Sequence, residues 1–436
     1  MKAVISPGKL NGRIPAPPSK SYAHRMLIGA ALAGGQSTLT GISSSEDMLA
    51  TMDCISALHA ETEYEPLTET VRIKGIGTQK GRSSEEACEA QTNAVCGKGN
   101  GTKNEDSTDV SGLPVFPCRE SGSTLRFFIP IALALFGGGC FTGTERLIER
   151  GIGVYEELFR ERGIAVEKTE KTVTVKGTLP AGTYQLKGDI SSQFVTGLLF
   201  ALSLLEEESC IQVLPPVESR PYIDITLDVM RTFGAEVSEP EENRFVIKGG
   251  QTYAPGEFRV EGDWSNAAFL YGFRAIGNDL SVTGLKEESI QGDKACVRFF
   301  EQLKEKETLP CIDLSETPDL GPVLFAAAAA LGGARFTGTR RLRIKESDRA
   351  QAMAEELLKF GVQVHVEDNE VTVLPSVPEK PAVPLFGHND HRIVMALSML
   401  CSLTGGTIEG CEAVKKSWPD YFTVLKENGL CVEIIE

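Results

Sequence analysis

Two short motifs in the second half of the chain combine carboxylates with cations. The motif RLRIKESDR includes Lys345, Glu346 and Arg349, and the motif TPD ends at Asp319. Cations can hold the negative charge of a substrate while carboxylates move protons, so this combination suits general acid–base chemistry on an anionic substrate. A solvated helix face or an N-capping arrangement would also account for RLRIKESDR taken alone.

Further polar residues lie in short clusters that have the composition of helix starts. Helix N-termini expose unpaired N–H groups and the positive end of the macrodipole, so several of them converging on one point would form an anion site. The clusters are Ser19-Lys20-Ser21, Glu120-Ser121-Gly122-Ser123-Thr124, Ser191-Ser192-Gln193, Asp263-Trp264-Ser265-Asn266, Thr317-Pro318-Asp319 and Asn389-Asp390-His391-Arg392.

Basic side chains near these clusters strengthen the expectation of an anionic ligand. Arginine suits bidentate binding of carboxylate and phosphate, whereas lysine supplies a movable point charge. The cations are Lys20, Arg25, Arg126, Arg150, Arg349, Arg392 and Lys416.

Hydroxyl and amide groups indicate a ligand with ring hydroxyls. Ser191, Ser192 and Gln193, together with Ser219 in SRPY, can bond to ring hydroxyls and phosphate oxygens. His391 is either part of this chemistry or a core histidine. The sequence has no Gly-rich nucleotide motif between a strand and a helix, and no metal-ligand spacing, so we expect neither a nucleotide nor a metal.

The six clusters open six copies of one repeating unit. After each cluster comes an apolar stretch with small residues, then, in most copies, a Gly-rich break and a strand ending near Thr-Gly, as in GGQSTLTG, GGGCFTGT and GGARFTGT. Most copies continue with a second helix and a hairpin, as in KFGVQVHVEDNEVTVLP. Order as well as composition is shared, which favours a true repeat over the Gly breaks of any α/β protein. Thr78 to Gly112 interrupts the repeat, and its polar, Gly- and Ser-rich composition predicts an inserted surface loop.

Composition and charge limit the class of protein. A chain of 436 residues exceeds what one hydrophobic core usually supports, so we expect two domains of three units each. The net charge of −16 argues against nucleic acid or an anionic membrane as a partner. No apolar run is long enough to cross a bilayer and no secretory signal is evident, so we expect a cytoplasmic protein. Eleven cysteines without CxxC pairs fit reduced thiols better than a disulfide framework.

An ordered set of motifs resembles the 5-enolpyruvylshikimate-3-phosphate synthase family of enolpyruvyl transferases. The set spans essentially the whole chain apart from the insertion, and the order makes it far more specific than any single motif. The motifs are PPSKSYAHR, ESGSTLR, ISSQF, SRPYIDIT, EGDWSNAA, TPD, RLRIKESDR, NDHR and KKSWPDYF.

The resemblance implies a fold and a division of the chain. The fold is a two-domain inside-out α/β barrel of six βαβαββ repeats, three per domain, with the active site in the cleft between them. Residues 19–261 would form one domain, and residues 1–18 plus 262–436 the other. Lys20 and Asp263 would then lie at the hinges.

The resemblance also implies a reaction. Members of this family transfer the enolpyruvyl group of phosphoenolpyruvate to the 5-hydroxyl of shikimate 3-phosphate and expel phosphate through a tetrahedral ketal, in the shikimate pathway toward chorismate and the aromatic amino acids. No cofactor is implied, the partners are the two small-molecule substrates, and we expect a monomer.

The family's site residues carry over to matching positions of this sequence. Asp319 would take the proton from the 5-hydroxyl, Glu346 would protonate the methylene carbon, and Lys20 would assist the leaving phosphate. Contacts to shikimate 3-phosphate would come from Lys20, Ser21, Arg25, Ser191, Ser192, Gln193, Ser219, Asp319 and Lys345. Contacts to phosphoenolpyruvate would come from Lys20, Gly122, Arg150, Gln193, Arg349, Arg392 and Lys416.

Two positions depart from the family pattern. Glu120 stands where Asn is commonest, and Arg341 stands where some members place a substrate-contacting Asn. A carboxylate pointing into a phosphoenolpyruvate pocket would repel the ligand, so Glu120 is expected either to pair with a local Arg or to face away.

Two other functions are compatible with parts of the sequence. The sister enzyme that acts on UDP-N-acetylglucosamine has the same fold and donor, but it usually carries a cysteine where this chain has Glu145. A binding module without catalysis is disfavoured because Lys20, Asp319, Glu346 and Arg349 are all retained.

Overall fold

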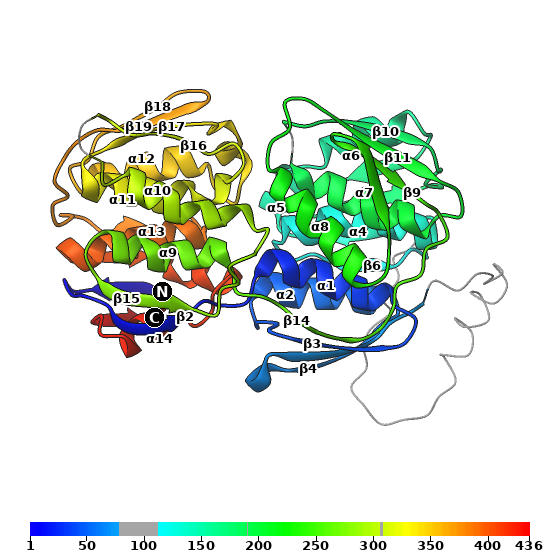
Figure 1. Cartoon of the computed structure of the whole chain (residues 1–436), viewed down its shortest axis with the longest axis horizontal. Coiled ribbons are helices and arrows are strands. Elements are labelled where there is room, and N and C mark those ends of the chain that lie inside the picture. The colour runs from blue at the N-terminus through cyan, green and yellow to red at the C-terminus, as the bar shows by residue number, and fades with distance from the viewer. Residues whose placement is uncertain (78–111, 190, 306–307) are drawn as a thin grey trace.

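The chain forms two lobes that lie side by side (Figure 1). The computed structural model describes residues 1–77, 112–189, 191–305 and 308–436. We call residues 19–261 the continuous half, and residues 1–18 together with 262–436 the split half. The predicted insertion lies outside the described residues except for its last residue, Gly112.

Each of the six predicted clusters lies at the start of a helix. Five of the helices are capped by a side chain that accepts a hydrogen bond from a backbone N–H of the first turn, and the caps are Ser19, Ser121, Ser191, Asp263 and Asp390. The helices are α1 (Lys20–Leu32), α4 (Gly122–Phe136), α7 (Ser192–Leu204), α9 (Trp264–Ala275), α11 (Gly321–Leu331) and α13 (His391–Thr404).

The fifth cluster differs because its side chain does not cap the helix. Pro318–Leu320 forms a 3₁₀ turn, η4, which leads directly into α11. Asp319 therefore lies in this turn, and its carboxylate remains available for other partners.

These first helices are apolar on nearly all sides and form the interior of each lobe. Every residue of α13 from His391 to Ser402 is buried. α4 packs against α7, and α11 packs against α13. A helix that is apolar all round is stable only inside a core, so the small-residue stretches place these helices centrally and leave the sheets outside.

One strand follows each first helix, as the repeat predicts. These strands are β3 (Gln36–Thr40), β7 (Gly138–Thr142), β11 (Ser209–Leu214), β15 (Asp279–Thr283), β17 (Ala334–Thr337) and β21 (Gly406–Glu409). Each pairs in parallel with a short strand, and these partners are, in the same order, β14 (Glu257–Arg259), β6 (Val115–Pro117), β10 (Thr183–Lys187), β2 (Asn11–Pro15), β16 (Cys311–Asp313) and β20 (Leu385–Phe386).

A second helical segment and a hairpin complete most units. The helical segments are α2 (Glu46–Ala57), α5 (Glu145–Glu149) with α6 (Gly153–Arg160), α8 (Arg220–Thr232), η3 (Gly292–Ala295) with α10 (Cys296–Gln302), α12 (Arg349–Lys359) preceded by η5 (Arg340–Ile344), and η6 (Cys411–Lys416) with α14 (Tyr421–Glu427). The hairpins are β4 (Glu61–Glu65) with β5 (Thr70–Lys74), joined by η1 (Pro66–Thr68), then β8 (Ala165–Lys168) with β9 (Thr172–Lys176), β12 (Val237–Glu241) with β13 (Arg244–Ile247), and β18 (Val364–Val366) with β19 (Glu370–Val373).

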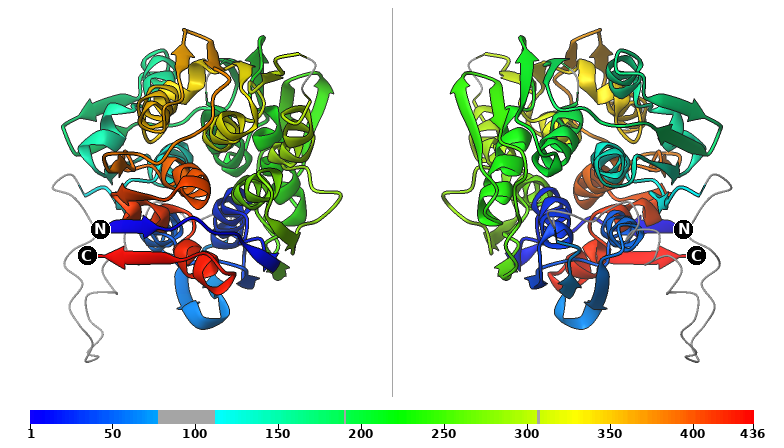
Figure 2. Two further views of the ribbon diagram at one scale, coloured as in Figure 1. Left: turned by 90° about the vertical axis from the view of Figure 1, so that its left-hand side faces the viewer. Right: turned by 90° about the vertical axis from the view of Figure 1, so that its right-hand side faces the viewer.

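The last unit is closed by the two ends of the chain instead of a hairpin. β1 (Lys2–Ile5) pairs with β21 on one side and with β22 (Val432–Ile435) on the other, so the termini lie together (Figure 2). Within the described residues, β15 and β2 form a sheet of two strands, whereas the other five sheets have four. The predicted α/β fold of repeated units is confirmed, with the fourth unit reduced.

The chain passes twice between the lobes at one place. β2 precedes α1 in sequence but pairs with β15 of the split half, and β14 precedes α9 but pairs with β3 of the continuous half. Pro18 and Gly262 form an antiparallel bridge where these two crossings meet, and the backbone N–H of Lys20 donates to Asp263 at 2.9 Å.

Two clusters of buried apolar side chains follow the same division. One runs from Tyr22 to Val260. The other combines Ala3 to Ile14 with Trp264 to Val432. That each half is a domain with these boundaries stays a prediction.

The described residues include free cysteines, two of which lie close together. The nine cysteines among the described residues are all free, and the thiols of Cys54 and Cys118 lie 3.9 Å apart in the core. No helix of the described residues is long and apolar enough to cross a membrane.

Candidate active site

All six helix starts contribute to the wall of one cavity between the halves. The cavity has a volume of about 300 Å³. The residues that the helix starts contribute include Lys20, Ser21, Gly122, Ser123, Ser191, Ser192, Gln193, Asp263, Ser265, Asp319 and Arg392. The convergence that the sequence predicted is therefore present, and it places backbone N–H groups and positive helix ends around one space.

Three cations surround the carboxylate of Asp319. Its Oδ1 lies 2.8 Å from Nη1 of Arg349 and 3.0 Å from Nζ of Lys345. Its Oδ2 lies 3.1 Å from Nη2 of Arg392. Burial would raise the pKa of Asp319, but the charges of Arg392, Lys345 and Arg349 outweigh burial and hold this pKa well below its usual value. Asp319 is therefore ionised at neutral pH and can accept a proton.

Arg349 lies beneath the cavity and joins three carboxylates. Only 1% of its side chain is exposed. Besides Asp319, its guanidinium lies 2.7 Å from Oε2 of Glu346 and 2.8 Å from Oδ2 of Asp390. Asp390 is the cap of α13, so one arginine ties the catalytic candidates to the start of a core helix.

Glu346 faces a more varied set of charges. Burial would raise its pKa, but the charges of Arg349, Arg150 and Lys20 together hold it well below its usual value. Since Arg150 and Lys20 come from the continuous half, the ionisation of Glu346 depends on both sides of the cavity. A ligand that engages these cations would weaken their hold on Glu346 and raise its pKa.

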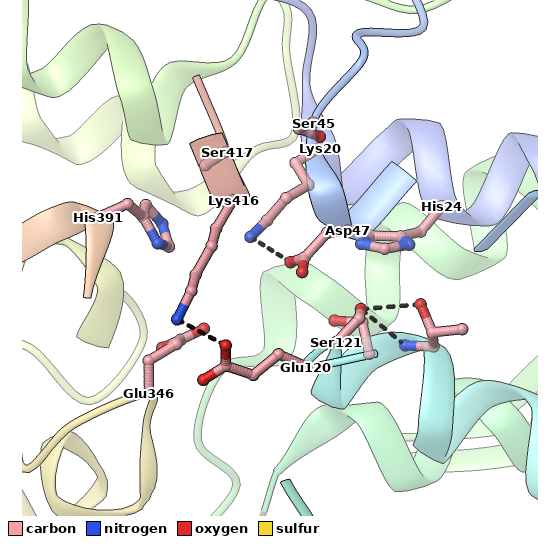
Figure 3. Close-up of polar contacts among 12 residues, drawn as sticks. Lys20, His24, Ser45, Asp47, Glu120, Ser121, Glu346, His391, Lys416 and Ser417 are labelled. Atoms are coloured by element: carbon pink, nitrogen blue, oxygen red, sulfur yellow. Dashed lines mark hydrogen bonds and ion pairs between the residues drawn. The ribbon is translucent and has the colours of Figure 1, made fainter. Parts of the chain in front are cut away.

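Lys20 meets an acidic partner that the sequence did not reveal. Its Nζ lies 2.9 Å from Oδ2 of Asp47, which is in the first turn of α2 (Figure 3). Burial lowers the pKa of Lys20, but Asp47 and Glu346 more than offset it, and the net shift is upward. The sequence does not indicate this contact of Asp47, because SSSED has the composition of an ordinary helix start.

Gly122 lies against two arginines, which explains why this position has no side chain. A Cβ there would come within 3.0 Å of Nη2 of Arg150 and 3.1 Å of Nη1 of Arg126. Arg126 donates to Oε1 of Gln193 at 2.6 Å, and Gln193 in turn donates to Ser123 at 2.8 Å. These contacts form a wall of two guanidinium groups beside Gly122, which itself lines the cavity.

The predicted shikimate-phosphate side of the cavity is held rigidly. Arg25 donates to the carbonyl oxygens of Ser21 at 2.6 Å and Tyr222 at 3.1 Å, and burial lowers its pKa to about 10. Arg341, whose role the sequence left open, lines the cavity and donates to Oγ of Ser219. This contact crosses from the split half to the continuous half.

Lys345 has an unusual acidity for a lysine. Burial lowers its pKa to about 8, and the attraction of Asp319 only partly offsets this effect. Its ammonium group is therefore charged at neutral pH and loses the charge in mildly alkaline solution.

The predicted site residues lie around one cavity, but two of them, Arg349 and Lys416, do not line its wall. Lys20, Ser21, Arg25, Gly122, Arg150, Ser191, Ser192, Gln193, Ser219, Asp319, Lys345, Glu346 and Arg392 line the cavity. Arg349 lies behind Asp319 and Glu346. Lys416 is paired with Glu120 at 3.0 Å (Figure 3), so the ion pair of Glu120 is not with a local arginine, and Glu120 does not line the cavity. Its partner is a lysine from the other half.

Two buried histidines belong to the surroundings of the site. Burial and the neighbouring cations Lys20 and Arg392 hold the pKa of His391 well below its usual value, which keeps its ring neutral. His24 lines the cavity, and its Nδ1 lies 2.7 Å from Oγ1 of Thr51. Among the described residues, no group of three or more His, Cys, Asp or Glu side chains is arranged to hold a metal ion.

Comparison with solved structures defines the class of fold. An EPSP synthase from Acinetobacter baumannii matches the whole chain over its own full length, with a TM-score of 0.74 and 24% identity. An enolpyruvyl transferase from Streptomyces tendae matches with a TM-score of 0.73 and 13% identity, over 99% of this chain and 98% of its own. The fold is thus that of the enolpyruvyl transferases.

Sequence comparison identifies the family within that class. The profile of the EPSP synthase (3-phosphoshikimate 1-carboxyvinyltransferase) family matches residues 4–99 and 86–425. The 3-phosphoshikimate 1-carboxyvinyltransferase of Clostridium kluyveri is 36% identical, covering 98% of this chain and 96% of the relative. That of Clostridioides difficile is 34% identical, covering 98% and 97%. The chain belongs to the EPSP synthase family.

Proposed function

We propose that this enzyme transfers the enolpyruvyl group of phosphoenolpyruvate to the 5-hydroxyl of shikimate 3-phosphate and releases phosphate. Family membership supports the reaction. The observation that carries the site assignment is the arrangement of Asp319 and Glu346, two carboxylates on one buried arginine, Arg349, at the wall of a cavity rich in cations.

The cations answer the main electrostatic problem of the reaction. Phosphoenolpyruvate and shikimate 3-phosphate are both multiply charged anions, so bringing them together in one cavity requires positive charge that is already in position. Lys20, Arg150 and Arg392 line the part of the cavity assigned to phosphoenolpyruvate, and Arg25 and Lys345 line the part assigned to shikimate 3-phosphate.

Asp319 is proposed as the general base. Its depressed pKa keeps it ionised, so it can take the proton of the 5-hydroxyl as the oxygen forms a bond to C2 of phosphoenolpyruvate. The three cations around Asp319 also attract the negative charges of the substrates. The base therefore lies beside the bound anions.

Glu346 is proposed to deliver a proton to the methylene carbon of phosphoenolpyruvate, which completes the tetrahedral ketal. In the second stage it removes a proton from the resulting methyl group as the C–O bond to phosphate breaks, and Lys20 stabilises the departing phosphate. Donation requires a protonated Glu346. Engagement of Arg150 and Lys20, which line the cavity, by the trianionic donor would raise the pKa of Glu346 and make this form accessible.

Phosphate release tests the assignment directly. The purified protein should release phosphate from phosphoenolpyruvate only when shikimate 3-phosphate is present. Release with UDP-N-acetylglucosamine in place of shikimate 3-phosphate would move the assignment to the sister enzyme, and no release with either acceptor would favour a binding module.

A further inference from the structure

Glu120 belongs to the continuous half, but its carboxylate contacts two residues of the split half. One carboxylate oxygen lies 3.0 Å from Nζ of Lys416, and the other accepts a hydrogen bond from Nδ2 of Asn389 at 2.8 Å. Figure 3 shows the side chains of Glu120 and Lys416 extended toward each other. Only 23% of Glu120 and 11% of Lys416 are exposed, so water weakens this pair less than it weakens a surface pair.

The pair decides where the ammonium group of Lys416 lies. Nζ of Lys416 also donates to the carbonyl oxygen of Asn389 at 2.5 Å. Asn389 immediately precedes Asp390, the cap of α13, whose second residue is Arg392. Glu120 thus contacts both the end of η6 and the loop that begins α13, and Lys416 is directed to this contact and does not line the cavity.

Phosphoenolpyruvate, the proposed ligand, and Glu120 would compete for the ammonium group of Lys416. Phosphoenolpyruvate presents a phosphate and a carboxylate, and each is the kind of group that a lysine ammonium binds. Glu120 already holds the ammonium group with a carboxylate. The anion therefore has to replace that carboxylate, and it also meets the repulsion of Glu120.

We propose that Glu120 determines the affinity for the anionic donor by competing with it for Lys416. This inference rests on the proposed function, because it takes phosphoenolpyruvate as the donor. Glu120 is a positioning residue here, since it acts through Lys416 and takes no part in proton transfer. Shikimate 3-phosphate is unaffected, because its assigned contacts Ser191, Ser219 and Arg25 do not involve this pair.

The substitution Glu120→Gln isolates the charge. Glutamine keeps the volume and can still accept the hydrogen bond from Asn389, but it releases Lys416. The KM for phosphoenolpyruvate should fall roughly two- to fivefold, the range for loss of one partly exposed ion pair. The kcat should change less than about twofold and the KM for shikimate 3-phosphate should stay the same.

A matched control separates the contact from the general loss of one negative charge. Glu46, at the start of α2 in the same half, pairs with Arg119 at 2.8 Å and does not contact Lys416. Glu46→Gln should leave both KM values unchanged. A double-mutant cycle completes the test, because Glu120→Gln should have little further effect in a Lys416→Met background.

The outcomes distinguish this inference from the proposed function. If the wild type is active but Glu120→Gln has an unchanged KM for phosphoenolpyruvate, this inference is overturned and the proposed function stands. A rise in both KM values has the same consequence, because it would mean that Glu120 merely holds the halves together. If Glu120→Gln lowers the KM for phosphoenolpyruvate equally in the Lys416→Met background, the inference is also overturned, since the effect would then not depend on Lys416. Absence of wild-type turnover overturns the proposed function and this inference together.

Discussion

Replacement of Arg349 by methionine tests the inference that one buried guanidinium stabilises three carboxylates. Methionine fills much of the same volume but leaves Asp319, Glu346 and Asp390 without their shared cation. Removing one partner of a buried ion pair costs about 3–5 kcal/mol. Protonation limits the loss, since neutralising a carboxyl whose pKa is about 4 costs roughly 4 kcal/mol at pH 7. We therefore expect the free energy of unfolding to fall by about 4 kcal/mol at pH 7.

The pH dependence of this loss follows from the direction of the pKa shifts. The pKa values of Asp319 and Glu346 are depressed in the folded protein. Their contribution to stability is therefore present above the unfolded value of about 4 and is lost as the pH falls through the folded values. The difference between the wild type and Arg349→Met should be largest at neutral pH and should shrink below about pH 4.

Denaturant unfolding followed by circular dichroism at several pH values measures both effects. The control is Arg343→Met, which removes an arginine of the same motif whose ion pair with Asp368 is exposed and should cost only about 0.2–1 kcal/mol. A loss below about 1 kcal/mol for Arg349→Met at pH 7 would refute the reasoning, as would a difference that does not depend on pH.

Three further predictions concern catalysis. Asp319→Asn and Glu346→Gln should each lower kcat by at least about 100-fold, the lower end for general acid–base groups, and near-normal turnover in steady-state assays would remove those roles. Burial lowers the pKa of Lys345 to about 8, so its charge is present below that pH and absent above it. The KM for shikimate 3-phosphate should therefore rise above about pH 8 in the wild type. In Lys345→Arg this KM should not change with pH, since arginine remains charged. Gly122→Ala would place a Cβ 3.0 Å from Nη2 of Arg150, so the KM for phosphoenolpyruvate should rise about tenfold, equivalent to roughly 1.4 kcal/mol of lost binding, while the KM for shikimate 3-phosphate should not change.

The helix starts could be predicted because their chemistry is local. Ser19, Ser121 and Asp263 lie within three residues of the N–H groups that they cap, so a short stretch of sequence contains both partners. Asp319 shows the limit of this reasoning. The sequence correctly predicts a helix start at its cluster, but it does not predict the 3₁₀ turn that leaves the carboxylate free of a capping role.

The ion pairs across the cavity could not be predicted in the same way. Glu120 and Lys416 belong to different halves, and nothing near either residue indicates the other. Lys20 and Asp47 are closer in sequence, yet the second residue of α2 meets the first residue of α1 only because α1 and α2 pack together. Such pairs follow from the tertiary arrangement, and the resemblance to the family could supply only positions that match its motifs.

The split half combines the first 18 residues with residues 262–436, and this affects how the chain is made. The continuous half has nearly all its strands once residue 259 has been synthesised. β1 and β2, although they are synthesised first, pair with β21, β22 and β15. At about 5–20 residues per second, β2 waits roughly 15–50 s for β15, and β1 waits longer. β1 and β2 of a nascent chain therefore stay without these partners until late in synthesis, and an extension that hindered their pairing would affect a late step of folding.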